Sequence, residues 1–176
     1  MKNIVTIGGS NSKSSINKVL AEYVGSLVNN VELTNVDLNN FEMPLFSVDV
    51  EAQIERPLGV KELNEIIEKA DGFVISLAEH NGAYSTAFKN AFDWLSRIDG
   101  KVWKDKPMLL LATSPGARGG QTVLEVAAGR FPYMGAQIIG SLAVPSFFEN
   151  FKEGKIVNTD LKSAIEKMVS DFEKAL

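Results

Sequence analysis

The sequence alternates short apolar runs with longer segments whose apolar residues recur at helical spacing, and few folds are compatible with this alternation. Parallel strands are joined by crossovers that are usually helices, so the pattern predicts a parallel sheet with helices between its strands. We expect strands at residues 4–7, 31–38, 73–78, 108–113 and 136–142, and helices at residues 16–28, 60–70, 87–98, 121–131 and 161–172. Because right-handed crossovers place helices on both faces, the fold class predicted is an α/β doubly wound sheet of five parallel strands.

The composition narrows the classes of function. With 176 residues, 45% of them hydrophobic, the chain is expected to form one domain over residues 1–176. It has no cysteine and one histidine, which excludes disulfides and thiol nucleophiles and argues against a transition-metal enzyme. The net charge of −4, without a block of one sign, indicates no nucleic-acid partner. No apolar run approaches the roughly 20 residues of a membrane span or forms a signal-peptide core, so we expect a cytoplasmic protein without a membrane partner.

The loop after the first predicted strand carries a run of small polar residues. Gly8-Gly9 is followed by SNSKSSIN, which ends where the first helix begins. Backbone N–H groups at a helix start form an anion site, and neutral side chains join them at Ser10, Ser12, Ser15 and Asn17. The simpler alternative is that Ser14 or Ser15 only caps the helix. The run lacks both the P-loop ending and the dinucleotide fingerprint, so it favours a phosphate monoester.

Two further loops follow the third and fourth predicted strands, AEHNGAY at residues 78–84 and SPGARGG at residues 114–120. Their glycines permit positive φ angles and close approach of a ligand to the backbone. For either loop alone a plain turn is the simpler interpretation. Because the carboxyl ends of parallel strands meet at one edge, all three loops are predicted to converge on one crevice. The long polar connection over residues 39–57 is interpreted as a functional or interfacial segment.

Several segments also resemble a known family. GSNSKSSIN at residues 9–17 is similar to its phosphate loop, and SPGARGG at residues 114–120 to its third flavin loop. AEHNGAYSTAFKNAFDWLS at residues 78–96 is the most specific match and resembles its flavin-ring loop and the following helix. Weaker similarities are MPLFSVDVE at residues 43–51 and FENFKEGKI at residues 148–156. The family is that of the NAD(P)H-dependent FMN reductases, a flavodoxin-like group that includes azo, quinone and chromate reductases.

The resemblance implies a flavodoxin-like fold, FMN as cofactor, and NADPH or NADH as co-substrate. It implies that the FMN phosphate is bound by Ser10, Ser12, Ser15, Ile16 and Asn17. It implies that the isoalloxazine ring is bordered by Glu79, His80, Asn81 and Gly82, with Ser114, Gly116 and Gly119 closing the other side.

Three positions depart from the family pattern. Ser12 stands where the family often has arginine, so a charge-assisted phosphate contact is lost and weaker FMN binding is expected. Ala78 replaces a proline, which loosens the entry to the ring loop. His80 replaces a tyrosine. It is either a hydrogen-bonded structural residue or a modulator whose protonation tunes the flavin between about pH 5 and 8.

The activity implied is that of an FMN-dependent oxidoreductase, which passes hydride from a nicotinamide to FMN and then two electrons to a small acceptor by a ping-pong route. Quinones, azo compounds, metal oxyanions and free flavin are all acceptors of this kind. Because the flavin supplies the chemistry, no catalytic side chain is expected. The family also implies a homodimer or homotetramer. The alternatives are a flavodoxin-type electron carrier without a pyridine-nucleotide site and a flavin-binding protein without turnover.

Overall fold

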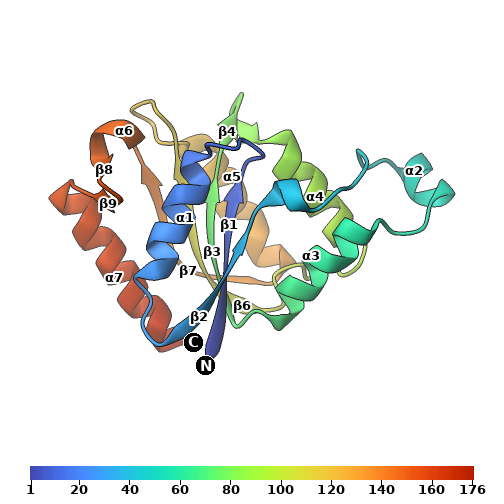
Figure 1. Cartoon of the computed structure of the whole chain (residues 1–176), viewed down its shortest axis with the longest axis horizontal. Helices are drawn as coiled ribbons and strands as arrows, with labels where there is room; N and C mark the ends of the chain where they lie inside the picture. Colours follow the sequence, from blue (N-terminus) through green and yellow to red (C-terminus); the bar gives the residue numbers. More distant parts are fainter.

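A parallel sheet of five strands, ordered β2-β1-β3-β6-β7, forms the centre of the chain in a computed structural model that describes residues 1–176 (Figure 1). The strands are β1 Lys2–Gly9, β2 Val31–Val36, β3 Gly72–Leu77, β6 Lys106–Thr113 and β7 Ala136–Val144. After β1 the chain adds β2 on one side and then returns to add β3 on the other side of β1. The order therefore confirms the predicted doubly wound fold and places its switch point between β1 and β3.

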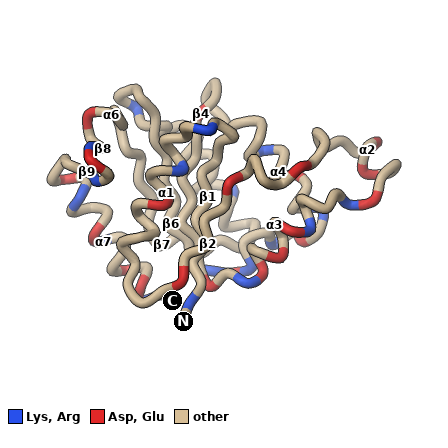
Figure 2. The backbone as a smooth tube through the Cα atoms, in the orientation of Figure 1, with Lys and Arg blue, Asp and Glu red and all other residues tan.

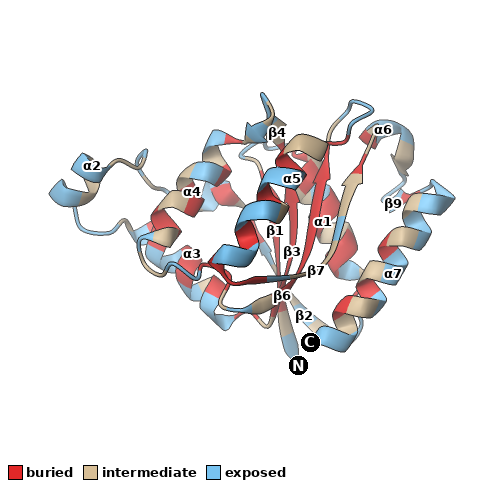
Figure 3. Cartoon of the chain, turned by 180° about the vertical axis from the view of Figure 1, so that it is seen from behind, coloured by how far each residue is buried: buried red, intermediate tan, exposed pale blue.

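Helices cover both faces of this sheet. They are α1 Ile16–Ser26, α3 Leu58–Lys69, α4 Thr86–Ser96, α5 Gln121–Arg130 and α7 Thr159–Ala175. α1 and α7 pack on one face, and α3, α4 and α5 pack on the other (Figure 1). In each helix the buried residues lie on the side that faces the sheet, as Figure 3 shows. The two apolar clusters that result form the core on either side of the strands.

The middle of the sheet is buried on both faces, which explains why its strands are mainly apolar and do not alternate between polar and apolar residues. Every residue of β3 is buried, and so is every residue of β6 after Lys106. Side chains alternate along β1, where Ile4 joins the cluster under α1 and α7 while Val5 joins the cluster under α3, α4 and α5. The strand β7 at the edge is only partly buried.

The expectation of five strands and five helices misses several short elements. These are the hairpins β4 Glu79–His80 with β5 Ala83–Tyr84 and β8 Phe151–Lys152 with β9 Lys155–Ile156, the helices α2 Val48–Gln53 and α6 Phe147–Asn150, and two 3-10 turns at Leu38–Asn40 and Phe131–Met134. Elements of two to six residues are too short to show a hydrophobic period. The strand expected over residues 31–38 ends at Val36, because Asp37 accepts the N–H of Asn39 and starts a 3-10 turn.

Residues 41–57 form an arm that carries α2 and projects beyond α3 and α4 (Figure 1). No residue of α2 is buried, and Leu45 and Val48 are 71% and 72% exposed. The base of the arm is fixed to α4, where Trp94 Nε1 donates to the Pro44 carbonyl at 2.8 Å and the Phe46 ring packs edge-on against Trp94. The arm is thus an exposed segment of mixed polar and apolar residues, which is held at its base and through the ion pair of Glu51 on α2 with Arg97 at 2.9 Å.

Charges of both signs are interspersed over the surface (Figure 2). Many form pairs one helical turn apart, such as Lys89 and Asp93 on α4 at 2.8 Å. Such exposed pairs contribute about 0.3–0.5 kcal/mol each. None of the helices combines the length and the apolar character that crossing a bilayer requires.

Candidate functional site

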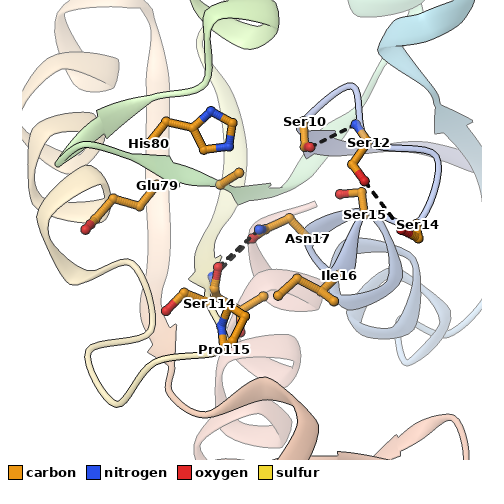
Figure 4. A pocket seen from close by; sticks show the side chains of 12 residues that line it. Ser10, Ser12, Ser14, Ser15, Ile16, Asn17, Glu79, His80, Ser114 and Pro115 are labelled. Carbon is orange, nitrogen blue, oxygen red and sulfur yellow. Dashed lines mark hydrogen bonds between the residues drawn. The ribbon is translucent and has the colours of Figure 1, made fainter.

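A cleft of about 190 Å³ opens at the carboxyl ends of β1, β3 and β6, beside the switch point of the sheet (Figure 4). Serines from the first loop lie along one side, His80 lies opposite them, and Ser114 and Pro115 lie near Ile16 (Figure 4). The lining residues are Ser10, Ser12, Ser14, Ser15, Ile16, Asn17, Ala78, Glu79, His80, Thr113, Ser114 and Pro115. The three loops predicted to converge therefore do meet in one place.

The first loop is folded around hydroxyl groups. Ser10 Oγ accepts the N–H of Ser12 at 3.1 Å, and the hydroxyls of Ser12 and Ser14 lie 3.5 Å apart. Ser15 is the N-cap of α1, since its Oγ accepts the N–H of Lys18 at 3.1 Å. The predicted cap is thus present, yet it occupies only one of the serines. The remaining hydroxyls border the cleft.

The start of α1 offers backbone donors without competing charge. The first N–H groups of a helix have no partner within it, which here concerns Ile16 and Asn17. No acidic residue occupies the first turn. Lys18 points elsewhere, because its Nζ is paired with Asp37 Oδ2 at 2.7 Å, and this hydrogen bond raises the pKa of Lys18 and lowers that of Asp37. The helix dipole therefore makes the start of α1 electrostatically positive, although its hydrogen-bond donors carry no formal charge. We call these backbone N–H groups and the neighbouring serine hydroxyls the neutral-donor cradle.

The lack of a side chain at Gly8 allows the start of α1 to lie directly against the end of β1. A Cβ atom at Gly8 would lie 2.5 Å from the Cα of Lys18, which is closer than side-chain carbons approach in proteins. The backbone of α1 therefore rests directly on β1. This contact places the first turn of α1 at the mouth of the cleft.

Asn17 is 3% exposed and bridges α1 to two strands. Its Oδ1 accepts from Ser76 Oγ at 2.7 Å and from the Thr113 N–H at 3.0 Å. Its Nδ2 donates to the Thr113 carbonyl at 3.1 Å (Figure 4). The side chain predicted to contact a phosphate is therefore occupied with bonds inside the protein.

The second loop is a hairpin over the cleft. Asn81 and Gly82 have φ angles of 53° and 75°, and two positive φ angles in a two-residue loop are typical of a type I′ turn. Glu79 Oε2 accepts the N–H of Val123 at 3.0 Å and so caps α5, whose own N-cap residue is a glycine. The ring of His80 is exposed at the cleft and makes no hydrogen bond within the chain.

The third loop is attached to the end of β7. The Ser114 and Gly116 carbonyls accept the N–H groups of Phe147 and Ser146 at 3.1 and 2.9 Å. Gly119 has a φ of +58°, and a Cβ there would meet the backbone at Val144 and Pro145 at 2.7 Å. Glycine is therefore required at this position by packing against β7.

The residues predicted for the site divide into two sets. Eight of them line the cleft, namely Ser10, Ser12, Ser15, Ile16, Asn17, Glu79, His80 and Ser114. The other four, Asn81, Gly82, Gly116 and Gly119, lie in the same loops but do not line it. The prediction omitted Ser14, Ala78, Thr113 and Pro115, which do line it. Ser14, Ala78 and Pro115 lie within the predicted loops, and Thr113 immediately precedes the third loop, so each is adjacent in sequence to a predicted residue.

A larger groove of about 440 Å³ lies between α4 and α5, and of the three loops only the second reaches it, through Tyr84. It is lined by Tyr84, Lys89, Phe92, Asp93, Ser96, Val126, Arg130 and Met134. The hydroxyl of Tyr84 is buried without a partner, and burial raises its pKa to about 12. The groove has no helix start and no glycine loop, so volume alone does not make it the better candidate for an anionic ligand.

A cleft at the switch point of a parallel sheet in this strand order defines the chain as a flavodoxin-like protein. The family model described as NADPH-dependent FMN reductase matches residues 2–149, and the chain belongs to that family. FMN is the cofactor of this family and NAD(P)H its reductant.

Individual relatives agree with this assignment. The chain is 34% identical over 117 residues to a quinone reductase of Escherichia coli (strain K12), a match that covers 66% of this chain and 62% of that protein. It is 33% identical over 122 residues to an NADPH azoreductase of Bacillus sp. (strain OY1-2), covering 69% and 64% of the two chains. The matches thus span less than two thirds of these relatives.

Among solved structures, the chain is similar to FerB, a flavoenzyme NAD(P)H:(acceptor) oxidoreductase from Paracoccus denitrificans. The TM-score is 0.78 at 23% identity, with 99% of this chain and 97% of that chain covered. At this level of identity the likeness concerns the fold.

The donor set of the cleft fits the phosphate end of FMN. A phosphate monoester needs several hydrogen-bond donors, and the cradle supplies hydroxyls and the unpaired N–H groups at the start of α1. Only one carboxylate lines the cleft, that of Glu79, and it already accepts the N–H of Val123. The volume of about 190 Å³ is below the roughly 300–1,000 Å³ of pockets that enclose a whole ligand. The cleft therefore has room for the phosphate and ribityl end and not for a whole enclosed flavin.

Proposed function

We propose that the chain is a single-domain, FMN-dependent NAD(P)H oxidoreductase that reduces a small acceptor such as a quinone, an azo compound, a metal oxyanion or free flavin by a ping-pong route. When bound, FMN accepts hydride from a nicotinamide and passes two electrons to the acceptor. The observation that carries the proposal is the neutral-donor cradle at the switch point, where all three loops meet. Family membership supports it.

The phosphate of FMN is proposed to be bound by the hydroxyls of Ser10, Ser12 and Ser15 and by the backbone N–H groups of Ile16 and Asn17. A helix start stabilises an anion without a counter-charge, which compensates in part for the absence of an arginine at position 12. This arrangement predicts that binding depends only weakly on salt, because the donors named here are all uncharged.

The flavin ring is proposed to lie between the β4–β5 hairpin and the loop over residues 114–120. The hairpin would contribute Glu79, His80, Asn81 and Gly82 along one edge, and Ser114, Gly116 and Gly119 would lie on the other side. Both loops are held by bonds to other elements, so they form a fixed frame. The chain's role is to bind and orient, and no side chain is required as a nucleophile or base.

The acceptor site is proposed to be completed by a second copy of the chain, in a homodimer or homotetramer. The supporting observation is the arm over residues 41–57, because it exposes the apolar side chains of Leu45, Val48 and Ile54, and exposed apolar surface marks interaction sites in proteins. A monomer at micromolar concentration in sedimentation analysis would contradict this part of the proposal.

The decisive measurement is the absorbance spectrum of the purified chain with FMN, before and after anaerobic addition of NADPH or NADH. We expect the flavin band to bleach and then return when a quinone is added. A bound flavin that neither nucleotide reduces would instead support the flavodoxin-type electron carrier. Failure to bind FMN would refute both functions.

His80 is proposed to modulate the flavin, since its ring is exposed beside the cleft and has no partner in the chain. The variant His80→Phe keeps a planar ring but cannot be protonated. We expect the rate of flavin reduction, measured over a range of pH, to differ between the wild type and the variant. Identical profiles for the two proteins would refute the role.

A further inference from the structure

The side chain of Asn17 makes three buried hydrogen bonds to residues on two different strands. We propose that this side chain is a positioning group, which fixes the start of α1 and the carboxyl ends of β3 and β6 relative to one another, and is not a ligand of the cofactor phosphate. The proposal rests on the proposed function, because the site that it positions is the FMN cleft.

The hydrogen-bonding capacity of the amide supports this role. Oδ1 accepts two hydrogen bonds, from Ser76 Oγ and from the Thr113 N–H, and these use both of its lone pairs. Nδ2 donates one hydrogen to the Thr113 carbonyl, which leaves one hydrogen of the amide. Asn17, Ser76 and Thr113 are 3%, 0% and 1% exposed, so the three bonds are shielded from solvent in the folded chain. Buried polar groups of this kind are costly to leave unpaired.

The position of these bonds explains what they control. Thr113 immediately precedes the third loop, which begins at Ser114, and Ser76 lies two residues before Ala78 in the second loop. Asn17 follows directly on Ser15 and Ile16, which end the first loop. One side chain therefore sets the distance between the bases of all three loops. A fourth bond, from Ser85 Oγ to the Gly9 carbonyl at 2.8 Å, ties the second loop to β1 at the same level.

A comparison of FMN with riboflavin separates positioning from phosphate binding, because riboflavin has the same ring and ribityl chain without the phosphate. If Asn17 positions the loops, Asn17→Ala weakens the binding of both flavins by a similar factor of about tenfold. The ratio of the two dissociation constants then stays within about twofold of the wild-type ratio. The measurement is flavin fluorescence titration at a temperature where circular dichroism shows the variant to be folded.

Two variants calibrate this comparison. Ser76→Ala removes one of the three bonds at a residue that does not line the cleft, so it should weaken both flavins alike and less than Asn17→Ala does. Ser12→Ala removes a hydroxyl that lines the cleft and should weaken FMN but not riboflavin. If Asn17→Ala fails to fold, Ser76→Ala still carries the test. The visible circular dichroism of bound flavin should change in both Asn17→Ala and Ser76→Ala, because the loops around the flavin ring are then displaced.

Two results would overturn the inference. Loss of FMN affinity with riboflavin affinity unchanged in Asn17→Ala would make the side chain a phosphate ligand. Unchanged affinity for both flavins in a folded Asn17→Ala would show that the three hydrogen bonds of Asn17 contribute to the stability of the fold and not to flavin binding.

Failure of the proposed function can be distinguished from failure of the positioning role, because in the first case the wild type itself binds neither FMN nor riboflavin. In that event amide hydrogen exchange of the flavin-free chain decides the positioning role. Asn17→Ala should then raise exchange together in residues 10–15, 78–84 and 114–120, whereas an increase confined to α1 would refute it.

Discussion

Replacing Gly8 with alanine tests whether the contact between α1 and β1 builds the cradle. The new Cβ would lie 2.5 Å from the Cα of Lys18, and ordinary contact begins at 3.4 Å, so the two backbones must separate by about 0.9 Å. Overpacking of this kind costs about 1–3 kcal/mol. In a chain of this size each kcal/mol corresponds to roughly 2–4 °C in Tm, so we expect a decrease of about 2–12 °C.

The same shift should reduce FMN affinity. A displacement of about 0.9 Å takes an N–H donor at the start of α1 beyond the 2.7–3.2 Å range of a hydrogen bond. Loss of one bond to a charged group is worth about 1.5–3 kcal/mol, or roughly ten- to a hundredfold in the dissociation constant. Calorimetric unfolding and flavin titration measure the two effects.

Gly129→Ala is the matched control, because it makes the same chemical change in α5 where a Cβ would meet no atom within 4 Å. It should raise Tm by about 1–4 °C, since alanine is favoured over glycine in a helix by roughly 0.5–1 kcal/mol. FMN binding should be unchanged. If Gly8→Ala is as stable as the wild type and binds FMN equally well, the close-contact explanation of the cradle is wrong.

Three further predictions concern stability. Ser15→Ala removes the cap of α1 and should lower the free energy of unfolding by about 0.5–2 kcal/mol in urea titration, and an unchanged midpoint would contradict the capping role. The hydrogen bond from Lys18 lowers the pKa of Asp37 below its usual 3.8, so its stabilisation is complete above that pH and is lost as the pH falls below it. Asp37→Asn should therefore show a smaller acid-induced loss of Tm below about pH 4 than the wild type, and parallel curves would refute the assignment. Burial raises the pKa of Tyr84 to about 12, so the stability linked to its neutral form is complete below pH 10 and is lost between about pH 10 and 12. Tyr84→Phe, which removes a buried hydroxyl without a partner, should leave Tm at neutral pH equal or higher, and a clear decrease would indicate a missed hydrogen bond.

Sequence reasoning predicts the parts of this protein that depend on local pattern. The strands β3 and β6 are mainly apolar on both faces because both faces are covered, and the cap at Ser15 follows from its place before a helical period. The convergence of the three loops follows from strand order alone. For the same reason, the sequence alone identifies the three loops that border the cleft.

What the sequence could not predict depends on contacts between distant residues. The bonds of Asn17 to Ser76 and Thr113 leave no trace in the local pattern, so the sequence does not reveal that this side chain bridges two strands. The hairpin at residues 79–84 did carry a signal, the pair Asn81-Gly82, but its two-residue strands are too short to stand out. No residue of the helix α2 is buried, so its sequence has no apolar face that would predict a helix.

The bond between Asn17 and Thr113 joins residues 96 apart in sequence, and that between Ser85 and Gly9 joins residues 76 apart. Contacts of such long sequence separation form only after much chain entropy has been lost, so the cleft exists only once three strands and their crossovers are assembled. A ligand of this cleft cannot guide the early steps of folding. It acts on the finished molecule by mass action, slowing unfolding while leaving the folding rate unchanged. Newly synthesised chains would therefore complete their sheet without the cofactor and acquire it afterwards.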